Sequence, residues 1–114
     1  MKLSHVHFKV RDLAESVRRF EVVWALRPAF QNEKMAVLPL GEFSLIVDAA
    51  DHDSHATIAF ASDDCERDFR AAKERGAEVI APPTKTGWGV IAAYLKGPGG
   101  LTVEIEEPPA KQNP

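Results

Sequence analysis

An internal repeat constrains the fold of this chain more than any other feature of its sequence. The segment HVHFKVRD at residues 5–12 aligns with TIAFASDD at residues 57–64, and FSLIVD at residues 43–48 aligns with LTVEIE at residues 101–106. In the first pair Val6 aligns with Ile58 and Phe8 with Phe60, and both segments end in an aspartate. A repeat of this kind indicates one supersecondary unit that is used twice.

Residues 3–10, at the start of the first copy, alternate between apolar and polar side chains. A period of two with β-branched and aromatic residues predicts a strand that is apolar on one face. The residues expected to face the core are Val6, Phe8 and Val10. The residues expected on the opposite face are His5, His7 and Lys9.

A helix is predicted after the first strand of each copy. Asp12 is a good N-cap, and the apolar residues that follow it recur at helical spacing. They are Leu13, Val17, Phe20 and Trp24. This helix should end before Pro28, because the residue before a proline avoids helical geometry. In the second copy, a helix capped by Asp63 or Asp64 should stop at Gly76.

The remaining segments complete a β-α-β-β-β unit in each copy, and the fold class is α+β. The first copy either lacks one short strand or pairs it loosely. Residues 82–89 are expected to form a loop, and residues 97–100, GPGG, a turn between strands. The other strands are expected at residues 35–38, 43–47, 56–61, 78–81, 90–96 and 101–106.

A chain of 114 residues fits a single domain, which we place at residues 1–108. Module one would span residues 1–50 and module two residues 56–108, with the polar segment 48–55 as a linker between them. Residues 109–114 are expected to form a flexible tail.

Charge and cysteine content exclude several classes of protein. Fourteen basic and seventeen acidic residues give a formal net charge of -3, whereas a nucleic-acid binder usually carries a basic surface. The single cysteine, Cys65, rules out an internal disulfide and suits a reducing compartment. No apolar run approaches the ~20 residues of a membrane span, and the first residues lack a secretory pattern. We therefore expect a cytoplasmic protein that binds neither nucleic acid nor membranes.

Four segments in this order carry a resemblance to a known family: HVHFKVRDLAESVRRF (5–20), AAKERGAEVIAPP (71–83), GWGVIAAYLKGPGG (87–100) and LTVEIEEP (101–108). The chain resembles the vicinal oxygen chelate superfamily of glyoxalases, bleomycin resistance proteins and extradiol dioxygenases. The resemblance implies two βαβββ modules in a curled, barrel-like mixed sheet, with helices outside and a small-molecule cleft inside. It also implies a homodimer. The chain departs from the family pattern at Ala25, where glycine is common, and in GPGG, which lacks two aspartates.

Metal-dependent members of that superfamily place up to four ligands at symmetry-related strand positions. Carried over through the repeat, these positions hold His5, Ile46, Thr57 and Glu104. Isoleucine cannot bind a metal and threonine is a weak ligand, so the resemblance implies an incomplete site at His5 and Glu104. His55 is the candidate third ligand, although a shift of two residues moves a side chain ~6.6 Å along a strand. We expect no cofactor, and the alternative is a divalent Zn, Ni, Mn or Fe ion.

The predicted cleft takes residues from both modules, including a tryptophan between two glycines. Three functions stay open at this point. The first is metal-independent binding and sequestration of a small molecule, as in bleomycin resistance. The second is a metal-dependent lyase, isomerase or dioxygenase that uses His5, Glu104 and one of His7 or His55. The third is a structural module without a ligand. The residues expected to line the cleft are His5, His7, Lys9, Thr57, Trp88, Tyr94, Thr102 and Glu104.

Overall fold

The computed structural model describes residues 1–109, which fall into two compact units. Unit 1 comprises Met1–Ala56 together with Gly97–Leu101, and unit 2 comprises Thr57–Lys96 together with the segment that begins at Thr102. The turn predicted at residues 97–100 therefore joins the first unit. Of the predicted tail, residues 110–114 lie outside the described residues.

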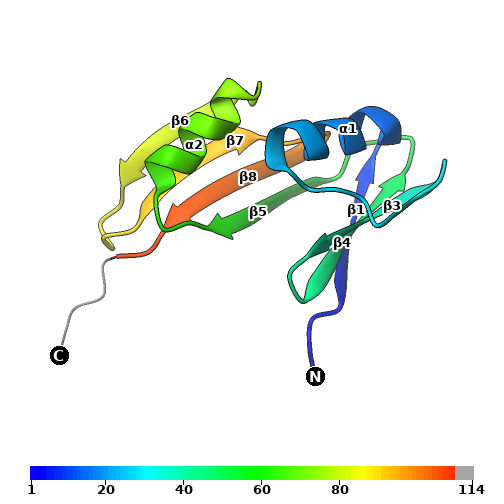
Figure 1. The fold of residues 1–114 in the computed structure, drawn as a ribbon, viewed down its shortest axis with the longest axis horizontal. Helices are drawn as coiled ribbons and strands as arrows, with labels where there is room; N and C mark the ends of the chain where they lie inside the picture. Colours follow the sequence, from blue (N-terminus) through cyan, green and yellow to red (C-terminus); the bar gives the residue numbers. More distant parts are fainter. Residues whose placement is uncertain (110–114) are drawn as a thin grey trace. The chain divides into compact units, whose positions relative to one another are not determined.

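The same arrangement of strands occurs twice along the chain (Figure 1). The first sheet has the order β1-β4-β3-β2 and the second the order β5-β8-β7-β6, which confirms the predicted βαβββ repeat and the α+β class. The first copy contains β1 (His5–Val10), α1 (Leu13–Trp24), β2 (Phe30–Gln31), β3 (Met35–Leu40) and β4 (Phe43–Ala49). The second contains β5 (His55–Ala61), α2 (Cys65–Glu74), β6 (Val79–Lys85), β7 (Ile91–Lys96) and β8 (Gly100–Glu107).

Both helices begin as the sequence predicts. The side chain of Asp12 accepts a hydrogen bond from the backbone N–H of Glu15 at 3.1 Å, and Asp64 accepts one from the N–H of Arg67 at 3.0 Å. Each carboxylate thereby pairs an N–H group that has no partner inside its helix. The choice between Asp63 and Asp64 is settled in favour of Asp64.

The two helices end differently. After α1 the chain turns at Ala25, whose φ of 56° is left-handed, and the N–H of Leu26 bonds the carbonyl of Phe20 at 3.0 Å. After α2 the turn falls on Gly76, with a φ of 105°. Glycine adopts positive φ without steric cost, whereas alanine does not. The predicted stop at Gly76 is confirmed, and α1 ends four residues before Pro28.

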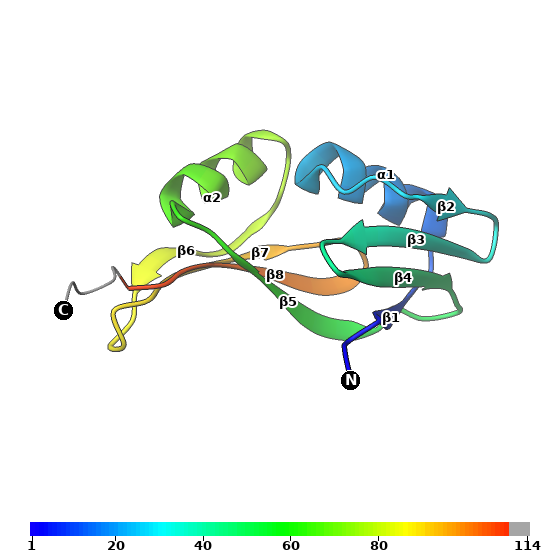
Figure 2. The same cartoon turned by 60° about the horizontal axis from the view of Figure 1, so that its bottom comes forward.

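Each helix packs on one face of a sheet, as Figure 2 shows for α1 over the first sheet and α2 over the second. The core residues of the first module are Phe8, Val10, Leu13, Val17, Phe20, Val23, Ala36, Leu38, Leu45 and Val47. Those of the second are Cys65, Phe69, Ala72, Ala77, Ala92, Ala93, Leu95, Leu101, Val103 and Ile105. Val6 lies on the predicted face, in one row with the buried Leu45 and Leu38, but is itself 43% exposed. It lies on β1, which is an edge strand with a neighbour on one side only.

Strand β6 corrects the prediction of a loop at residues 82–89. The strand continues through Pro82 and Pro83 to Lys85, and only residues 86–89 form the turn to β7. A proline lacks the N–H that a central strand needs, so proline is tolerated in a sheet at an edge or a bulge. Both conditions hold here, since β6 is at the edge of its sheet and its pairing with β7 shifts register twice.

The last glycine of GPGG is required by a close backbone approach. A Cβ atom built on Gly100 would lie 2.2 Å from the carbonyl oxygen of Ser54. The preceding Gly99 has a φ of 61° and lies against Val10 and Asp53. The start of β8 can therefore lie against the segment that leads into β5 only with no side chain at residue 100.

Candidate functional site

The face of the first sheet opposite α1 carries the polar residues that the sequence singled out. Paired residues on neighbouring strands point to the same face, so the strand register defines this surface. It consists of three rows across β1, β4 and β3, which we call the open face: His5, Ser44, Pro39; His7, Ile46, Val37; and Lys9, Asp48, Met35.

A histidine and a carboxylate pair at one end of the open face. The Nδ1 atom of His7 lies 2.7 Å from Oδ2 of Asp48, on the neighbouring strand β4. The His5 and His7 rings meet edge to face, with their centroids 5.1 Å apart. Nδ1 of His5 lies 3.0 Å from the hydroxyl oxygen of Ser4. The predicted shared face of the two histidines is therefore confirmed, and each ring has a polar neighbour at Nδ1.

The corresponding face of the second sheet is acidic. Tyr94 on β7 lies opposite Glu104 on β8, and Glu106 is two residues further along the same face. The negative charge of Glu104 raises the pKa of Tyr94, and partial burial and a hydrogen bond to the same carboxylate raise it further. A tyrosine hydroxyl that donates to a carboxylate keeps its proton more tightly. One of the two predicted metal ligands therefore lies opposite a phenol on the neighbouring strand.

The predicted cleft residues divide between the two units. His5, His7 and Lys9 belong to unit 1, whereas Thr57, Tyr94, Thr102 and Glu104 belong to unit 2. Trp88 lies in the turn between β6 and β7 and is 86% exposed. That these residues line one ligand cleft stays a prediction.

Sequence reasoning missed Asp48, which was assigned to the linker at residues 48–55. The strand β4 extends to Ala49, so Asp48 is its next residue after Ile46 on the open face. Extending the strand predicted at residues 43–47 by one residue would have found it.

The positions implied for metal ligands hold few good ligands. Through the repeat, Ile46 stands where Glu104 stands in the other copy, and Thr57 where His5 stands. Among residues 1–109, no three His, Cys, Asp or Glu side chains are grouped so that they could hold a metal ion. That the metal site is incomplete stays a prediction.

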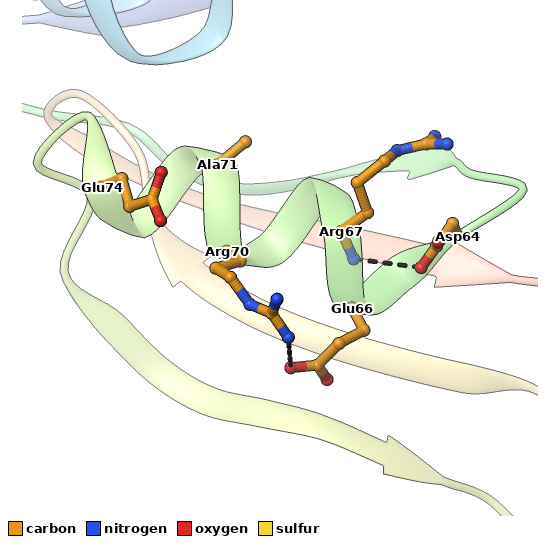
Figure 3. A pocket seen from close by; sticks show the side chains of 6 residues that line it. All are labelled: Asp64, Glu66, Arg67, Arg70, Ala71 and Glu74. Carbon is orange, nitrogen blue, oxygen red and sulfur yellow. Dashed lines mark hydrogen bonds and ion pairs between the residues drawn. The ribbon is translucent and has the colours of Figure 1, made fainter.

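A separate hollow of about 350 Å³ lies along α2, in unit 2 (Figure 3). Both of its arginines are paired: Arg70 with Glu66 of the lining at 3.2 Å, and Arg67 with Asp63, outside the lining, at 2.7 Å. Cys65, in the first turn of this helix, is buried and donates to the carbonyl of Ile105. Burial raises the pKa of its thiol, and the surrounding carboxylates add to this, which makes it a poor nucleophile.

Two comparisons place this fold among known proteins. The family model of the Glyoxalase/Bleomycin resistance protein/Dioxygenase superfamily matches residues 2–105. The chain belongs to this superfamily. No curated protein matches it.

Many solved structures share the glyoxalase-like fold. A glyoxalase/bleomycin resistance protein/dioxygenase from Nocardioides has a TM-score of 0.83 at 16% identity, covering 100% of this chain and 87% of its own. A bleomycin resistance determinant encoded on the transposon Tn5 has a TM-score of 0.77 at 18% identity, covering 95% and 98%. A superfamily enzyme from Burkholderia phytofirmans PsJN has a TM-score of 0.79 at 17% identity, covering 94% and 98%. Likenesses at these identities show the fold alone.

Neither helix among residues 1–109 has the length and apolar content of a membrane span.

Proposed function

We propose that this superfamily member binds and sequesters a small molecule without a metal ion. One observation carries the proposal: two of the four positions implied for metal ligands hold Ile46 and Thr57. At a third position, Glu104 lies beside the hydroxyl of Tyr94 and raises its pKa. Of the four, only His5 is an exposed side chain suited to a metal, and a single imidazole does not hold a divalent ion.

The chemistry of the remaining face supports binding of a planar, polar aromatic compound. The open face offers partly exposed aliphatic side chains at Val37 and Ile46 beside two imidazoles. In the other unit, Trp88 is a separate exposed aromatic side chain. Sites for small organic ligands combine apolar walls with a few polar groups that fix orientation. The proposal is in line with one fold neighbour, the bleomycin resistance determinant encoded on the transposon Tn5.

We also propose that the protein works in the cytoplasm as a homodimer. Dimers are by far the commonest symmetric assembly of soluble proteins, and two exposed apolar residues, Val22 and Phe30, lie at 52% exposure each. Sedimentation equilibrium of the purified protein would test this, with a monomer mass over the micromolar range as the contrary result.

A second candidate is a metal-dependent lyase, isomerase or dioxygenase with an irregular ligand set. It is favoured by the exposed imidazole of His5 and the carboxylate of Glu104, with His55 or His7 as a third ligand. The two candidates differ in whether the protein takes up one metal ion per chain.

Metal content separates them. The purified protein, His5→Ala and Glu104→Gln would be titrated with Zn, Ni, Mn and Fe(II) by calorimetry, and their metal content measured by mass spectrometry. Glu106→Gln is the matched control, since Glu106 lies two residues from Glu104 on the same face. Binding without metal predicts no stoichiometric uptake by any of the four proteins. One metal per chain that both site variants lose and the control keeps would establish the second candidate.

Ligand binding is measured on the same proteins. Bleomycin and a panel of planar aromatic compounds would be titrated while tryptophan fluorescence is followed, in the parent protein and in Trp88→Phe. We expect saturable quenching by at least one compound in the metal-free protein, with the Trp88→Phe variant showing how much of the signal comes from that residue. A complete lack of binding across the panel would leave the third function, a module without a ligand.

A further inference from the structure

We propose that His7, held by Asp48, is the residue that selects the ligand, and that it selects planar ring compounds carrying a hydroxyl or N–H hydrogen-bond donor. This inference rests on the proposed function, since it names the chemistry of the ligand that the protein binds. It is carried by a pairing that the sequence did not reveal, between two residues on neighbouring strands of the first sheet.

Asp48 sets the direction of hydrogen bonding at His7. A carboxylate has only acceptor atoms, so the contact of 2.7 Å between Asp48 Oδ2 and His7 Nδ1 places the imidazole proton on Nδ1. In the neutral ring the other nitrogen, Nε2, then carries a lone pair. An imidazole oriented in this way accepts a hydrogen bond, and its natural partner is a ligand O–H or N–H group.

Two neighbours, His5 and Asp48, orient the His7 ring. The edge-to-face contact with His5, at 5.1 Å between centroids, supports His7 from the neighbouring row. His5 lies 3.0 Å from the hydroxyl of Ser4. With Asp48 bonded on one side and His5 packed on another, Nε2 has a defined direction although the His7 side chain is 55% exposed. Orientation fixed before binding lowers the entropy that binding must overcome.

Aliphatic side chains lie beside His7 on the open face. His7, Ile46 and Val37 occupy one row across β1, β4 and β3. Neighbouring strands are ~4.8 Å apart, so this row is roughly 10 Å long, about the length of a fused two-ring system. Both aliphatic residues are partly exposed. A planar ring can therefore lie on Ile46 and Val37 while its donor group reaches His7.

The second module offers no equivalent acceptor. Through the repeat, the position of His7 is occupied by Ala59 and that of Asp48 by Glu106. A methyl group cannot accept a hydrogen bond, and the carboxylates on that face accept without a fixed imidazole. Selection by His7 is thus a property of the first sheet alone. The experiments can therefore tell it apart from binding at the second sheet.

The orientation of His7 can be measured without any ligand. Nitrogen-15 shifts of the imidazoles, read from long-range proton–nitrogen correlations, report which ring nitrogen carries the proton. We expect the Nδ1–H form for His7 in the parent protein and a mixture of forms in Asp48→Ala. Asp51→Ala is the matched control, because Asp51 makes an equal contact of 2.7 Å with His52 in the linker. An Nε2–H form in the parent protein, or no change in Asp48→Ala, would overturn the inference.

The ligand class is tested with two probes that differ by one donor, 2-naphthol and 2-methoxynaphthalene. Binding would be followed by chemical shifts in the parent protein, Asp48→Ala and His7→Phe. We expect 2-naphthol to bind about five-fold more tightly than the ether, as one net hydrogen bond predicts, with shifts at His7 and Ile46. Both variants should bind the two probes equally.

The failures of the two proposals are distinguishable. Equal affinity of the parent protein for both probes, or shifts confined to the second sheet, would overturn selection by His7 while supporting small-molecule binding. If neither probe binds at millimolar concentration, selection of simple donor-bearing rings is refuted. The bleomycin and aromatic panel described above then decides the proposed function separately.

Discussion

Module one, which contains β1–β4 and α1, and module two, which contains β5–β8 and α2, arrange their strands in the same order. They carry different side chains on equivalent faces. The faces that meet the helices are alike, with Leu45 and Val47 in one module matched by Val103 and Ile105 in the other. The opposite faces share almost nothing. Where module one has His5 and His7, module two has Thr57 and Ala59.

This difference shows which face of each sheet the fold depends on. Burial of the apolar face against a helix supplies most of the stability, so that face is held to one pattern. The other face meets no helix of its module and is free to carry any chemistry. The two modules therefore share the scaffold. The side chains on the faces opposite the helices differ between them.

The modules also differ at their turns. Module one ends its helix on an alanine in a left-handed conformation and follows it with a strand of two residues. Module two ends its helix before a glycine and follows it with β6, a strand of seven residues. Of the two alternatives predicted for the first copy, a missing strand or a short one, β2 shows the second.

The largest predicted effect comes from the anchors of the two helices. Phe20→Ala should lower the free energy of unfolding by about 4 kcal/mol, because a fully buried ring leaves a cavity. Phe69→Ala should cost about 3 kcal/mol, since Phe69 is 8% exposed and Phe20 only 1%. Urea denaturation measures both.

The control for these anchors is Val22→Ala, on the exposed side of α1, which should change stability by less than about 0.5 kcal/mol. If Phe20→Ala does not fold, Phe20→Leu provides a smaller, measurable loss. A loss at Phe20 no larger than that at Val22 would contradict the core described here.

A second prediction compares the two turns that lead into β4 and β8. Gly100→Ala should lower stability by about 3 kcal/mol, because its Cβ would meet the carbonyl of Ser54. The equivalent change in module one, Glu42→Ala, falls on an exposed residue and should cost less than about 0.5 kcal/mol. Equal losses in the two turns, read from urea midpoints, would show that Gly100 has no special role.

A third prediction concerns the residues with positive φ that follow the two helices, Ala25 and Gly76. Ala25→Gly should raise stability by about 1 kcal/mol, because glycine adopts the left-handed conformation without strain. Gly76→Ala should lower it by about the same amount, since its φ of 105° is unfavourable for alanine. Ala14→Gly, inside α1, is the control and should be destabilising by about 1 kcal/mol. A loss at Ala25→Gly in thermal or urea unfolding would contradict the assigned conformation.

The smallest effect concerns the acidic face of module two. Glu104 raises the pKa of Tyr94, so the folded state holds this proton more tightly than the unfolded chain does. The resulting stabilisation is fully present below the ordinary tyrosine pKa of about 10 and is lost as pH rises through the raised value. The chain has one tyrosine, so the ultraviolet absorbance of tyrosinate follows it directly.

In that titration, Glu104→Gln should move the midpoint down toward the ordinary value. Glu78→Gln, which removes a carboxylate that pairs with Lys96, is the matched control and should leave the midpoint in place. A midpoint unaffected by Glu104→Gln would mean that the two side chains do not interact in solution.

Much of the scaffold followed from the sequence alone. The alternation of residues 5–10, the capping aspartates Asp12 and Asp64 and the stop at Gly76 are all local patterns, and each is found where it was predicted. Local patterns are readable because backbone geometry couples residues that are two to four positions apart. The repeat then extended each local assignment to its second copy, and the family resemblance followed from their order.

The tertiary structure decided what depends on register and on contacts between distant segments. His7 and Asp48 are 41 residues apart, and their pairing requires β1 and β4 to lie side by side in one particular register. Gly100 is constrained by Ser54, and β6 tolerates two prolines because it is an edge strand. A one-residue slip of any of these strands would keep every local pattern and turn every side chain to the other face, so only the packed sheet fixes which residues meet.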